Sequence, residues 1–228
     1  MPAPLSIVIP TLNVADRLGP CLGALADGLH AGLIREVILS DGGSEDAIAD
    51  VADAVGARLV TGPKGRGMQL STGVRTARGA WVLLLHADSE LEAGWSESVL
   101  GHLRNHPDKA AFFRLRFASG HPLARLTEQW ARLRARIFGL SYGDQGLLIS
   151  REMLQEIGGV PELPLMEDVA LARRLRGRLQ PLGARITTSA ERYQRNGWLR
   201  QGMGNLWRQV RFLCGARPET LLKGYERQ

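Results

Sequence analysis

Residues 80–95 read Ala-Trp-Val-Leu-Leu-Leu-His-Ala-Asp-Ser-Glu-Leu-Glu-Ala-Gly-Trp, and this stretch decides the fold. Residues 81–85 form an unbroken apolar run of strand length, which is typical of a strand covered on both faces inside a parallel sheet. His86, Asp88 and Glu90 follow at once. Open α/β sheets bind ligands at the carboxyl ends of their strands, so this change from apolar to polar side chains indicates a functional site.

The chain has 228 residues, 44% hydrophobic and 23% charged, which is enough to bury the core of one large domain. Its 29 Lys and Arg outnumber 23 Asp and Glu, the formal charge is +6, and the excess follows Arg104. This balance suits an anionic partner: a phosphate-bearing ligand, a membrane surface or nucleic acid. Nucleic acid ranks last, because no recognised binding motif accompanies the basic residues.

Cysteine usage and the amino terminus bear on the compartment. Cys21 and Cys214 form neither a disulfide framework nor a zinc-ligand pattern, which fits a reducing environment. The first residues lack the basic and apolar regions of a signal peptide, and no apolar stretch approaches a membrane span. We therefore expect a cytoplasmic protein, with peripheral contact at the inner membrane face as an addition that its charge allows.

Strands and helices alternate through the first half of the chain. Strands are predicted at residues 5–9, 36–40, 58–61 and 81–85, with helices at 15–29, from about 44, and up to about 78. Ser44 is expected to cap the second of these helices. This β-α-β-α-β-α-β order predicts an α/β fold with a mostly parallel central sheet and helices on both faces, although the order of the strands cannot be read.

The second half has a less regular pattern. Strands are predicted at residues 110–117, 147–150 and 184–187, and helices at 93–105, 123–138, 166–175 and 198–213. Arginines and tryptophans of the helices at 123–138 and 198–213 suit a solvated face, a dimer surface or a membrane-surface patch.

Polar side chains follow strands or open a helix at four places. They are Thr11 with Asn13, Asp41, His86 with Asp88, and Glu167 with Asp168. Because the carboxyl ends of parallel strands meet at one edge of the sheet, these groups can line a single pocket there. Each alone is weak, since an Asp after a strand is usually a turn residue or a helix cap. Their combination is what indicates chemistry.

In this combination the chain resembles the inverting glycosyltransferases of family 2, which have the nucleotide-sugar-binding GT-A fold. The resemblance covers roughly residues 5–176 and rests on Ile-Pro-Thr-Leu-Asn at 9–13, on residues 36–46, on His-Ala-Asp at 86–88 and on Glu-Asp at 167–168. Gly65-Arg-Gly and Tyr142-Gly-Asp-Gln-Gly146 look most like a bacterial subgroup named for arsenosugar biosynthesis.

The resemblance implies a donor site. Pro10, Thr11 and Asn13 would flank the nucleotide, and Asp41 would accept the imide N–H of the uracil of a UDP-sugar. Asp88 matches the last acid of the family's Asp-x-Asp motif, which holds a divalent cation on the diphosphate.

The first acid of that motif is replaced here by His86. An imidazole with one carboxylate is a softer ligand set, which favours Mn²⁺ over Mg²⁺. The alternative is a His86 that binds no metal and hydrogen-bonds the sugar or a neighbouring acid.

The resemblance also implies a catalytic pair and further contacts. Asp168 matches the general base that takes the proton of the acceptor hydroxyl, and Glu167 matches the acid beside it. The alternative is a helix whose first turn carries two acids for its dipole alone. The remaining expected contacts are basic groups for the diphosphate, Lys64 and Arg66, and acceptor or sugar contacts, Asp144 and Gln145.

We therefore expect one glycosyltransferase domain over residues 1–228, with a nucleotide-binding half (about 1–110), an acceptor half (111–190) and a basic helical extension (191–228). The expected reaction moves a sugar from a UDP-sugar to a hydroxyl of a small-molecule or lipid-linked acceptor by metal-assisted single displacement. Alternatives are a nucleotidyltransferase on a related α/β fold and a non-catalytic nucleotide-sugar-binding protein. A homodimer is a further expectation, whereas a nucleic-acid partner is not expected.

Overall fold

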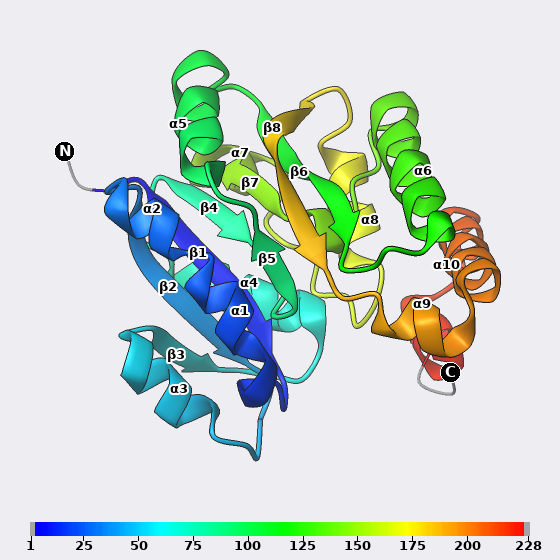
Figure 1. The fold of residues 1–228 in the computed structure, drawn as a ribbon, viewed down its shortest axis with the longest axis horizontal. Helices are drawn as coiled ribbons and strands as arrows, with labels where there is room; N and C mark the ends of the chain where they lie inside the picture. The colour runs from blue at the N-terminus through cyan, green and yellow to red at the C-terminus, as the bar shows by residue number, and fades with distance from the viewer. Residues whose placement is uncertain (1–2, 226–228) are drawn as a thin grey trace.

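A computed structural model describes residues 3–225, with side-chain environments up to residue 221. The core of the fold is one eight-stranded sheet in the order β3-β2-β1-β4-β7-β6-β8-β5 (Figure 1). The strands are β1 (Leu5–Thr11), β2 (Ile34–Asp41), β3 (Arg58–Thr61), β4 (Trp81–Leu84), β5 (Ser89–Leu91), β6 (Ala110–Phe117), β7 (Leu147–Ser150) and β8 (Leu179–Thr188).

The sheet is parallel at one end and mixed at the other. β3, β2, β1 and β4 run parallel, whereas β7 is antiparallel to both β4 and β6. β6 and β8 are parallel, and the short β5 runs antiparallel to β8 at the far edge. The predicted mostly parallel α/β sheet is thus confirmed, and the antiparallel β7 is what the alternation of strands and helices did not predict.

Helices cover both faces of the sheet. The longer ones are α3 (Ile48–Val55), α4 (Arg66–Thr76), α5 (Trp95–Asn105), α6 (Pro122–Phe138), α8 (Glu167–Arg174), α10 (Trp198–Leu213) and α11 (Pro218–Tyr225). The shorter ones are η1 (Ala15–Arg17), α1 (Leu18–Gly23), α2 (Ala26–His30), η2 (Gly143–Gln145), α7 (Arg151–Glu156) and α9 (Glu191–Asn196).

Alternation along the central strands divides the core between the two faces. Ile7 and Leu83 pack with α1, α3 and α5 on one face, and Val8 and Val82 pack with α4, α7 and α8 on the other. Successive strand residues point to opposite faces. An unbroken apolar run such as residues 81–85 is therefore what a strand with helices on both sides requires.

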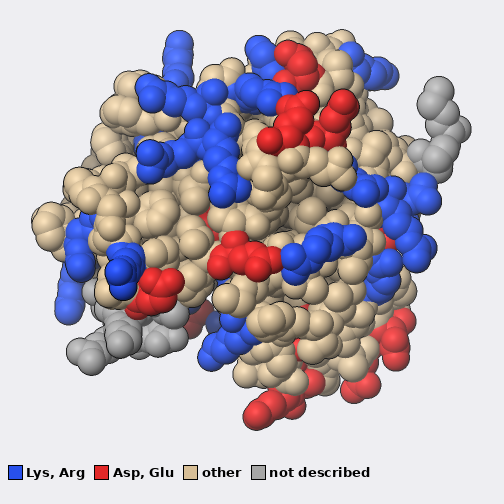
Figure 2. Space-filling model, turned by 180° about the vertical axis from the view of Figure 1, so that it is seen from behind, with Lys and Arg blue, Asp and Glu red and all other residues tan. Residues whose placement is uncertain are grey.

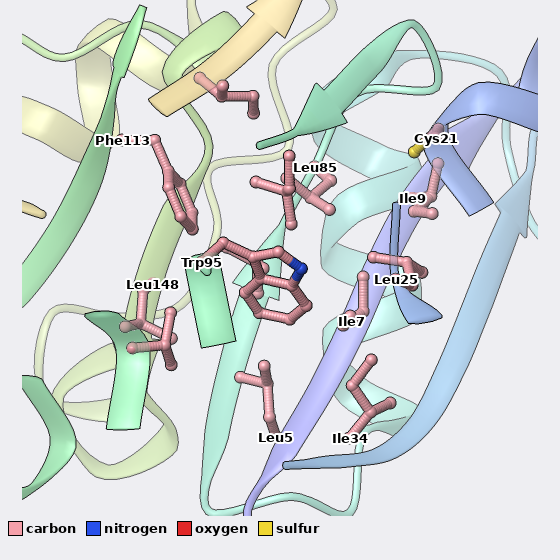
Figure 3. Packing of buried hydrophobic residues seen from close by; sticks show 14 of the residues in the cluster. Leu5, Ile7, Ile9, Cys21, Leu25, Ile34, Leu85, Trp95, Phe113 and Leu148 are labelled. Atoms are coloured by element: carbon pink, nitrogen blue, oxygen red, sulfur yellow. The ribbon is translucent and has the colours of Figure 1, made fainter. Parts of the chain in front are cut away.

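Trp95 sits at the centre of the first face, surrounded by apolar side chains from several strands (Figure 3). Its indole nitrogen donates to the carbonyl of Ala24 over 2.9 Å, and its ring lies against Gly28. A Cβ at Gly28 would come within 2.5 Å of the ring, so only glycine fits there. The prediction of one helix over residues 15–29 was wrong, because the segment consists of the three short helices η1, α1 and α2.

Two further predictions about local structure need correction. Ser44 does not cap α3, which begins at Ile48; its hydroxyl hydrogen-bonds Asp41 instead. The short β5 was missed, because three residues following a polar turn carry too little periodicity to predict a strand. By contrast, β3, β6, β7 and α10 have the predicted bounds.

A third apolar cluster joins β6 to α6 and α10. Trp198, at the start of α10, lies edge-on to Phe117 with ring centroids 5.4 Å apart and stacks on Tyr193 at 4.9 Å. α9 and the start of α10 are therefore packed onto β6 through aromatic side chains, and α10 lies beside α6 (Figure 1). Within the described residues no helix has the length and apolarity to cross a membrane.

Candidate active site

The loop after β1 and the loop after β2 form one structure. Asn13, which has a left-handed backbone (φ 51°), receives the backbone N–H of Glu45 on its side-chain oxygen over 2.9 Å. Its own N–H donates to the hydroxyl of Ser44 over 2.8 Å. Asn is among the residues that adopt this backbone region most readily. The sequence-predicted pair Asn13 and Asp41 is thus brought together through Ser44.

Asp41 is the hub of this structure. Its Oδ2 accepts the N–H groups of Gly43 and Ser44, both over 2.8 Å, and its Oδ1 accepts the hydroxyls of Thr11 (3.1 Å) and Ser44 (2.5 Å). Burial raises the pKa of Asp41, but these hydrogen bonds outweigh it and leave the pKa below its ordinary value. A carboxylate has about four lone-pair sites, so all of them are in use.

Gln69, a buried residue of α4, joins the carboxyl ends of β1 and β2 through hydrogen bonds. Its side-chain nitrogen donates to the carbonyl of Thr11 over 2.6 Å and to that of Ser40 over 3.1 Å. Gly42 lies against this side chain, since a Cβ there would be 3.0 Å from it. Pro10 is tolerated inside the sheet because β4 pairs with β1 only as far as Val8, so Pro10 has a strand partner on one side alone.

The first and second halves of the chain meet in an ion cluster. Nε of Arg66, at the start of α4, donates to Oε1 of the buried Glu167, and Nη2 of Arg66 lies 3.7 Å from Oδ2 of Asp168. Burial lowers the pKa of Arg66, but the two carboxylates outweigh it and keep the guanidinium charged. Arg66 thus binds the predicted catalytic pair, whereas Lys64 is exposed in the loop before it.

Asp168 has a partly open carboxylate. Its Oδ2 accepts the N–H of Gly143 over 2.9 Å and its Oδ1 accepts the N–H of Val169 over 2.8 Å. Its side chain keeps 18% of its surface exposed, whereas Glu167 keeps 1%. Each oxygen of Asp168 therefore retains an acceptor site, as a proton-accepting group requires.

His86 lies next to this cluster. A Cβ at Gly143 would be 2.5 Å from Nε2 of His86 and 3.5 Å from Oδ2 of Asp168, so both side chains close around that glycine. Burial, followed by the charge of Arg66, lowers the pKa of His86 to about 4. The imidazole is therefore neutral at pH 7 and has a lone pair available.

Two buried carboxylate oxygens have no hydrogen-bond partner among the described residues, Oδ1 of Asp144 and Oε2 of Glu167. Burial raises the pKa of Asp144 to about 6, although Arg134 acts in the opposite direction. Buried polar atoms are rarely left without a partner, so these two oxygens point to a group that the site is built to receive.

The turn that carries Asp144 is held by α6 and α10. The guanidinium of Arg134 lies 3.2 Å from the ring centroid of Tyr142, whose hydroxyl donates to Gln209 of α10. Gln145 is buried and links Tyr142 to β6 through the carbonyl of Phe113. Gln145 is thus a positioning residue of this turn in the structure, while Asp144 faces the ion cluster.

The donor set suits a divalent cation in part. Asp88 is exposed beside the neutral His86, and Mg²⁺ or Mn²⁺ on a diphosphate commonly takes only one or two protein ligands. The described residues contain no group of three His, Cys, Asp or Glu side chains arranged to hold a metal ion by themselves. The chemistry of the pair fits a cation that a diphosphate also binds.

A cavity of about 30 Å³ lies beneath the ion cluster and is lined by His86, Tyr142, Glu167 and Asp168 with apolar side chains of α4 and α8. It has room for about one water molecule, far less than a nucleotide-sugar needs. A donor would therefore lie over the open edge of the sheet, above Asp88 and the Asn13 loop.

Two residues of the site were missed from the sequence. Gln69 acts through hydrogen bonds to backbone carbonyls and belongs to no motif, and Gly143 stands in the motif at 142–146, which gave no sign of its close contact with His86. A third missed residue is Arg192 of α9. Burial lowers the pKa of its guanidinium, and the nearby carboxylate of Asp88 acts in the opposite direction. One arginine among the many of a basic sequence gives no signal of such a role.

This fold and strand-end site define the GT-A class of glycosyltransferases. A crystal structure of S. aureus TarS matches with a TM-score of 0.63 and 16% identity, over 82% of this chain and 36% of that chain. A crystal structure of glucosyl-3-phosphoglycerate synthase from Mycobacterium tuberculosis, in complex with Mn²⁺, UDP and phosphoglyceric acid, matches at 0.57 and 21%, over 78% and 67%. At such identities the likeness shows the fold, and the GT-A prediction is confirmed.

The chain belongs to glycosyl transferase family 2, whose sequence profile matches residues 6–150. A PGL/p-HBAD biosynthesis glycosyltransferase of Mycobacterium bovis (strain BCG / Pasteur 1173P2) is 39% identical over 115 residues, which are 46% of this chain and 44% of the relative. The chain thus aligns with less than half of that relative. The family prediction is confirmed, and the arsenosugar subgroup stays a prediction.

Proposed function

We propose that the protein is a glycosyltransferase that moves a sugar from a UDP-sugar to an acceptor hydroxyl with inversion, by single displacement. The observation that carries this proposal is the Asp168 carboxylate, partly open and flanked by Arg66 and His86 at the strand end of a family 2 chain. The crystal structure of S. aureus TarS in complex with UDP-GlcNAc, which shares the fold, supports the choice of donor class.

The donor nucleotide would bind over the Asn13 and Ser44 loops. Thr11 and Pro10 end β1 at this edge, and Asp41 would receive the uracil imide. Because the carboxylate of Asp41 already accepts four hydrogen bonds, the uracil must replace one of them. The hydroxyl of Ser44 is the donor that can rotate away at least cost, since hydroxyl rotors are free to reorient. The exposed side chain of Lys64, in the loop before α4, would bind the diphosphate.

Asp88 and His86 would hold the divalent cation, with Mn²⁺ preferred because an imidazole is among its ligands. A cation bound there supplies charge neutralisation for the diphosphate leaving group. The complex of glucosyl-3-phosphoglycerate synthase with Mn²⁺ and UDP supports this part of the proposal by analogy. If His86 is not a ligand, its neutral ring can donate to or accept from the sugar.

Asp168 would take the proton of the acceptor hydroxyl as the new glycosidic bond forms. Arg66 and Glu167 fix its position, and the N–H groups of Gly143 and Val169 orient its two oxygens. A positioned base of this kind contributes about 10²–10⁴ in rate. Asp144 is the competing base, because its raised pKa of about 6 lies nearer neutral pH and one of its oxygens has no partner.

The acceptor would approach Asp168 from the side of the η2 turn that carries Asp144. We propose a small-molecule or lipid-linked hydroxyl acceptor for a protein acting in the cytoplasm. Membrane contact and a homodimer would both use the exposed apolar side chains of α6 and α10. The arginines beside those side chains favour an anionic membrane.

The proposal is tested by incubating the full chain with a panel of UDP-sugars and Mn²⁺ and measuring UDP release, with calorimetry of UDP binding in parallel. We expect UDP affinity to rise when Mn²⁺ is added and Asp88→Asn to abolish that rise while folding is kept. The control is Asp53→Asn, which changes an exposed acid of α3. If UDP binds neither with nor without Mn²⁺, the donor assignment fails.

A second candidate function is a nucleotide-sugar-binding protein without turnover. The replacement of a motif acid by His86 favours it, because one carboxylate is lost where the diphosphate charge must be neutralised. Tight UDP binding without any UDP release, even with acceptor extracts added, would establish this function. A nucleotidyltransferase is disfavoured, since the loop after β1 reads Leu12-Asn13 and carries no glycine-rich phosphate loop.

A further inference from the structure

Helix α6 has three distinct faces. Its buried face packs Ala124 and Ala131 against β6. A second face is apolar yet exposed, with residues spaced four, three and four apart, Leu126, Trp130, Leu133 and Ile137. A third carries Arg125, Arg132 and Arg136. A helix that only needed to cover the sheet would carry polar residues on its outer side, so its apolar face is built for contact.

Helix α10 repeats the pattern. Its exposed apolar residues, spaced four, three, four and three apart, are Leu199, Met203, Leu206, Val210 and Leu213, with Trp207 beside them. Its sequence contains no acidic residue, and Arg200 and Arg211 are exposed. The two helices lie side by side at one end of the molecule (Figure 1).

We call these outer faces of α6 and α10 the α6–α10 surface. Its large apolar side chains, the ten named above and Phe138 at the end of α6, are 41–71% exposed. Over the residues whose side chains are described, the other large exposed apolar side chains are only Leu29 and Val55. Exposed apolar side chains are thus concentrated on two adjacent helices, which random surface composition does not produce.

A basic groove runs along the arginine face of α6. It encloses about 330 Å³ between α6, β6 and β8, and its charged lining consists of Arg114, Arg116, Arg125, Arg132, Arg185 and one acid, Glu128. Arg114 and Arg185 are directly paired in register on adjacent strands. Like charges at such positions repel each other, so the groove is stabilised when an anion occupies it.

The acids near this groove leave most of its charge unbalanced. Glu128 accepts the backbone N–H of Phe117, and Glu92 pairs with Arg116 over 3.0 Å. In the part of the chain whose side chains are described, Arg114, Arg125 and Arg132 make no salt bridge. The view from behind also shows a group of Lys and Arg side chains, with acidic side chains at its border and near the centre of that face (Figure 2).

The charge of the surface decides between two occupants. A second copy of the chain, bound through a two-fold axis, would place this positively charged surface against a surface of the same charge. An anionic lipid bilayer instead offers acyl chains to the apolar stripes and phosphates to the arginines, which is how amphipathic interfacial helices bind.

We propose that the α6–α10 surface docks the protein on an anionic membrane, with lipid phosphates in the basic groove. The same helices hold the turn of the candidate site, through Arg134 under Tyr142 and through the bond from Tyr142 to Gln209. Docking therefore places the Asp144 turn close to the lipid surface. The docking itself is independent of the proposed transferase activity, because vesicle binding requires no donor and no turnover.

The test is co-sedimentation of the full chain with vesicles of phosphatidylcholine alone or of phosphatidylcholine with roughly 30% phosphatidylglycerol, an anionic lipid. We expect partition into anionic vesicles and little into neutral ones. The variant Arg125→Gln with Arg132→Gln should lower the anionic partition coefficient roughly 30-fold, at about 1 kcal/mol per arginine. The variant Leu126→Gln with Leu133→Gln and Ile137→Gln should lower it about 10-fold or more.

Matched controls alter exposed residues elsewhere. Arg35→Gln with Arg104→Gln removes two exposed arginines, and Leu29→Gln with Val55→Gln removes the two exposed apolar side chains of the first half. Both should bind vesicles like the parent. All these positions are exposed, so folding should be retained and can be checked by thermal unfolding.

Three results would overturn the proposal. The first is a parent chain that ignores anionic vesicles. The second is binding that the α6 variants and the control variants reduce equally. The third is a parent dimer, seen by sedimentation velocity without lipid, that the triple apolar variant converts to monomer; this would assign the surface to a second copy of the chain.

Discussion

Asp41 shows how one residue can serve structure and recognition together. Its four hydrogen bonds fix the two loops over which the nucleotide is proposed to lie, and they do so before any ligand arrives. A loop that is held in place in advance costs less entropy to order on binding. The residue therefore has a measurable role in stability, separate from uracil.

We expect Asp41→Asn to lower the free energy of unfolding by about 2–4 kcal/mol at pH 7, because charge-assisted hydrogen bonds to a buried group are lost. The pKa of Asp41 is lowered in the folded chain, so its contribution is present above the ordinary value of 3.8 and disappears as pH falls through the folded value. Urea unfolding at pH 7 and at pH 3 measures this. The parent and Asp41→Asn should differ less at pH 3; an equal difference at both would contradict the ionic role.

Asp168 and Asp144 compete for the role of base, and a pair of variants separates them. Asp168→Asn keeps the hydrogen bond from Gly143 but cannot take up a proton, so single-turnover transfer should fall about 10²-fold or more with UDP affinity nearly unchanged. Asp144→Asn should have a smaller effect. Glu162→Gln, an exposed acid paired with Arg75, is the control. The reverse order of effects would move the base to Asp144.

For helices and strands, the hydrophobic pattern predicted the bounds of those elements that local sequence determines. The bounds of β3, β6 and β7 follow from apolar runs with turn residues on either side. The helix predicted over 15–29 is interrupted at residues 24–25, where the carbonyl of Ala24 accepts the indole N–H of Trp95, a residue 71 positions away. The order of the strands and the antiparallel β7 depend on contacts of this long-range kind, so the sequence did not indicate them.

The site followed the same division. The carboxylates and His86 stand in motifs, and strand ends predicted that they would gather. The hydrogen-bond partners of these side chains were not predicted. Arg66 was expected to bind a diphosphate, but it bonds Glu167, a residue 101 positions away. Side chains that act by holding others, such as Gln69, carry no periodic or motif signal.

The turn η2 gives a prediction at this scale. Gly143→Ala would force a methyl group against Nε2 of His86, 2.5 Å away, and disturb the contact with Asp168. We expect stability to fall by about 1–3 kcal/mol, as for other overpacked positions. Mn²⁺-dependent UDP binding should weaken as well. Gly101→Ala in α5, where nothing lies within 4 Å, is the control and should be neutral or slightly stabilising. Unchanged binding in Gly143→Ala would separate His86 from the donor site.

For the whole molecule, the important relation is between the two halves of the chain. Arg66 comes from the first half of the chain and Glu167 from the second, and strands of the two halves pair in one sheet where β4 meets β7. The site is therefore assembled only when the complete sheet forms. Within the segment 191–228, predicted as a basic helical extension of the domain, α9 and α10 pack on β6, and α10 bonds the η2 turn.

Two tryptophans of α10 test whether this helix is part of the folded domain. Trp198 and Trp207 both lie on α10, but Trp198 is buried among Phe117 and Tyr193, whereas Trp207 is 64% exposed. Trp198→Ala should cost about 3–5 kcal/mol, as removal of a buried aromatic side chain does. Trp207→Ala should stay within about 0.5 kcal/mol. Urea unfolding followed by circular dichroism measures both.

The two variants should also differ in activity. Because Gln209 of α10 bonds Tyr142, Trp198→Ala should displace the η2 turn and lower the rate of sugar transfer, whereas Trp207→Ala should leave that rate unchanged with a soluble acceptor. Equal stability of the two variants would mean that α10 is an appendage, and that the turn beside Asp144 is held by α6 alone.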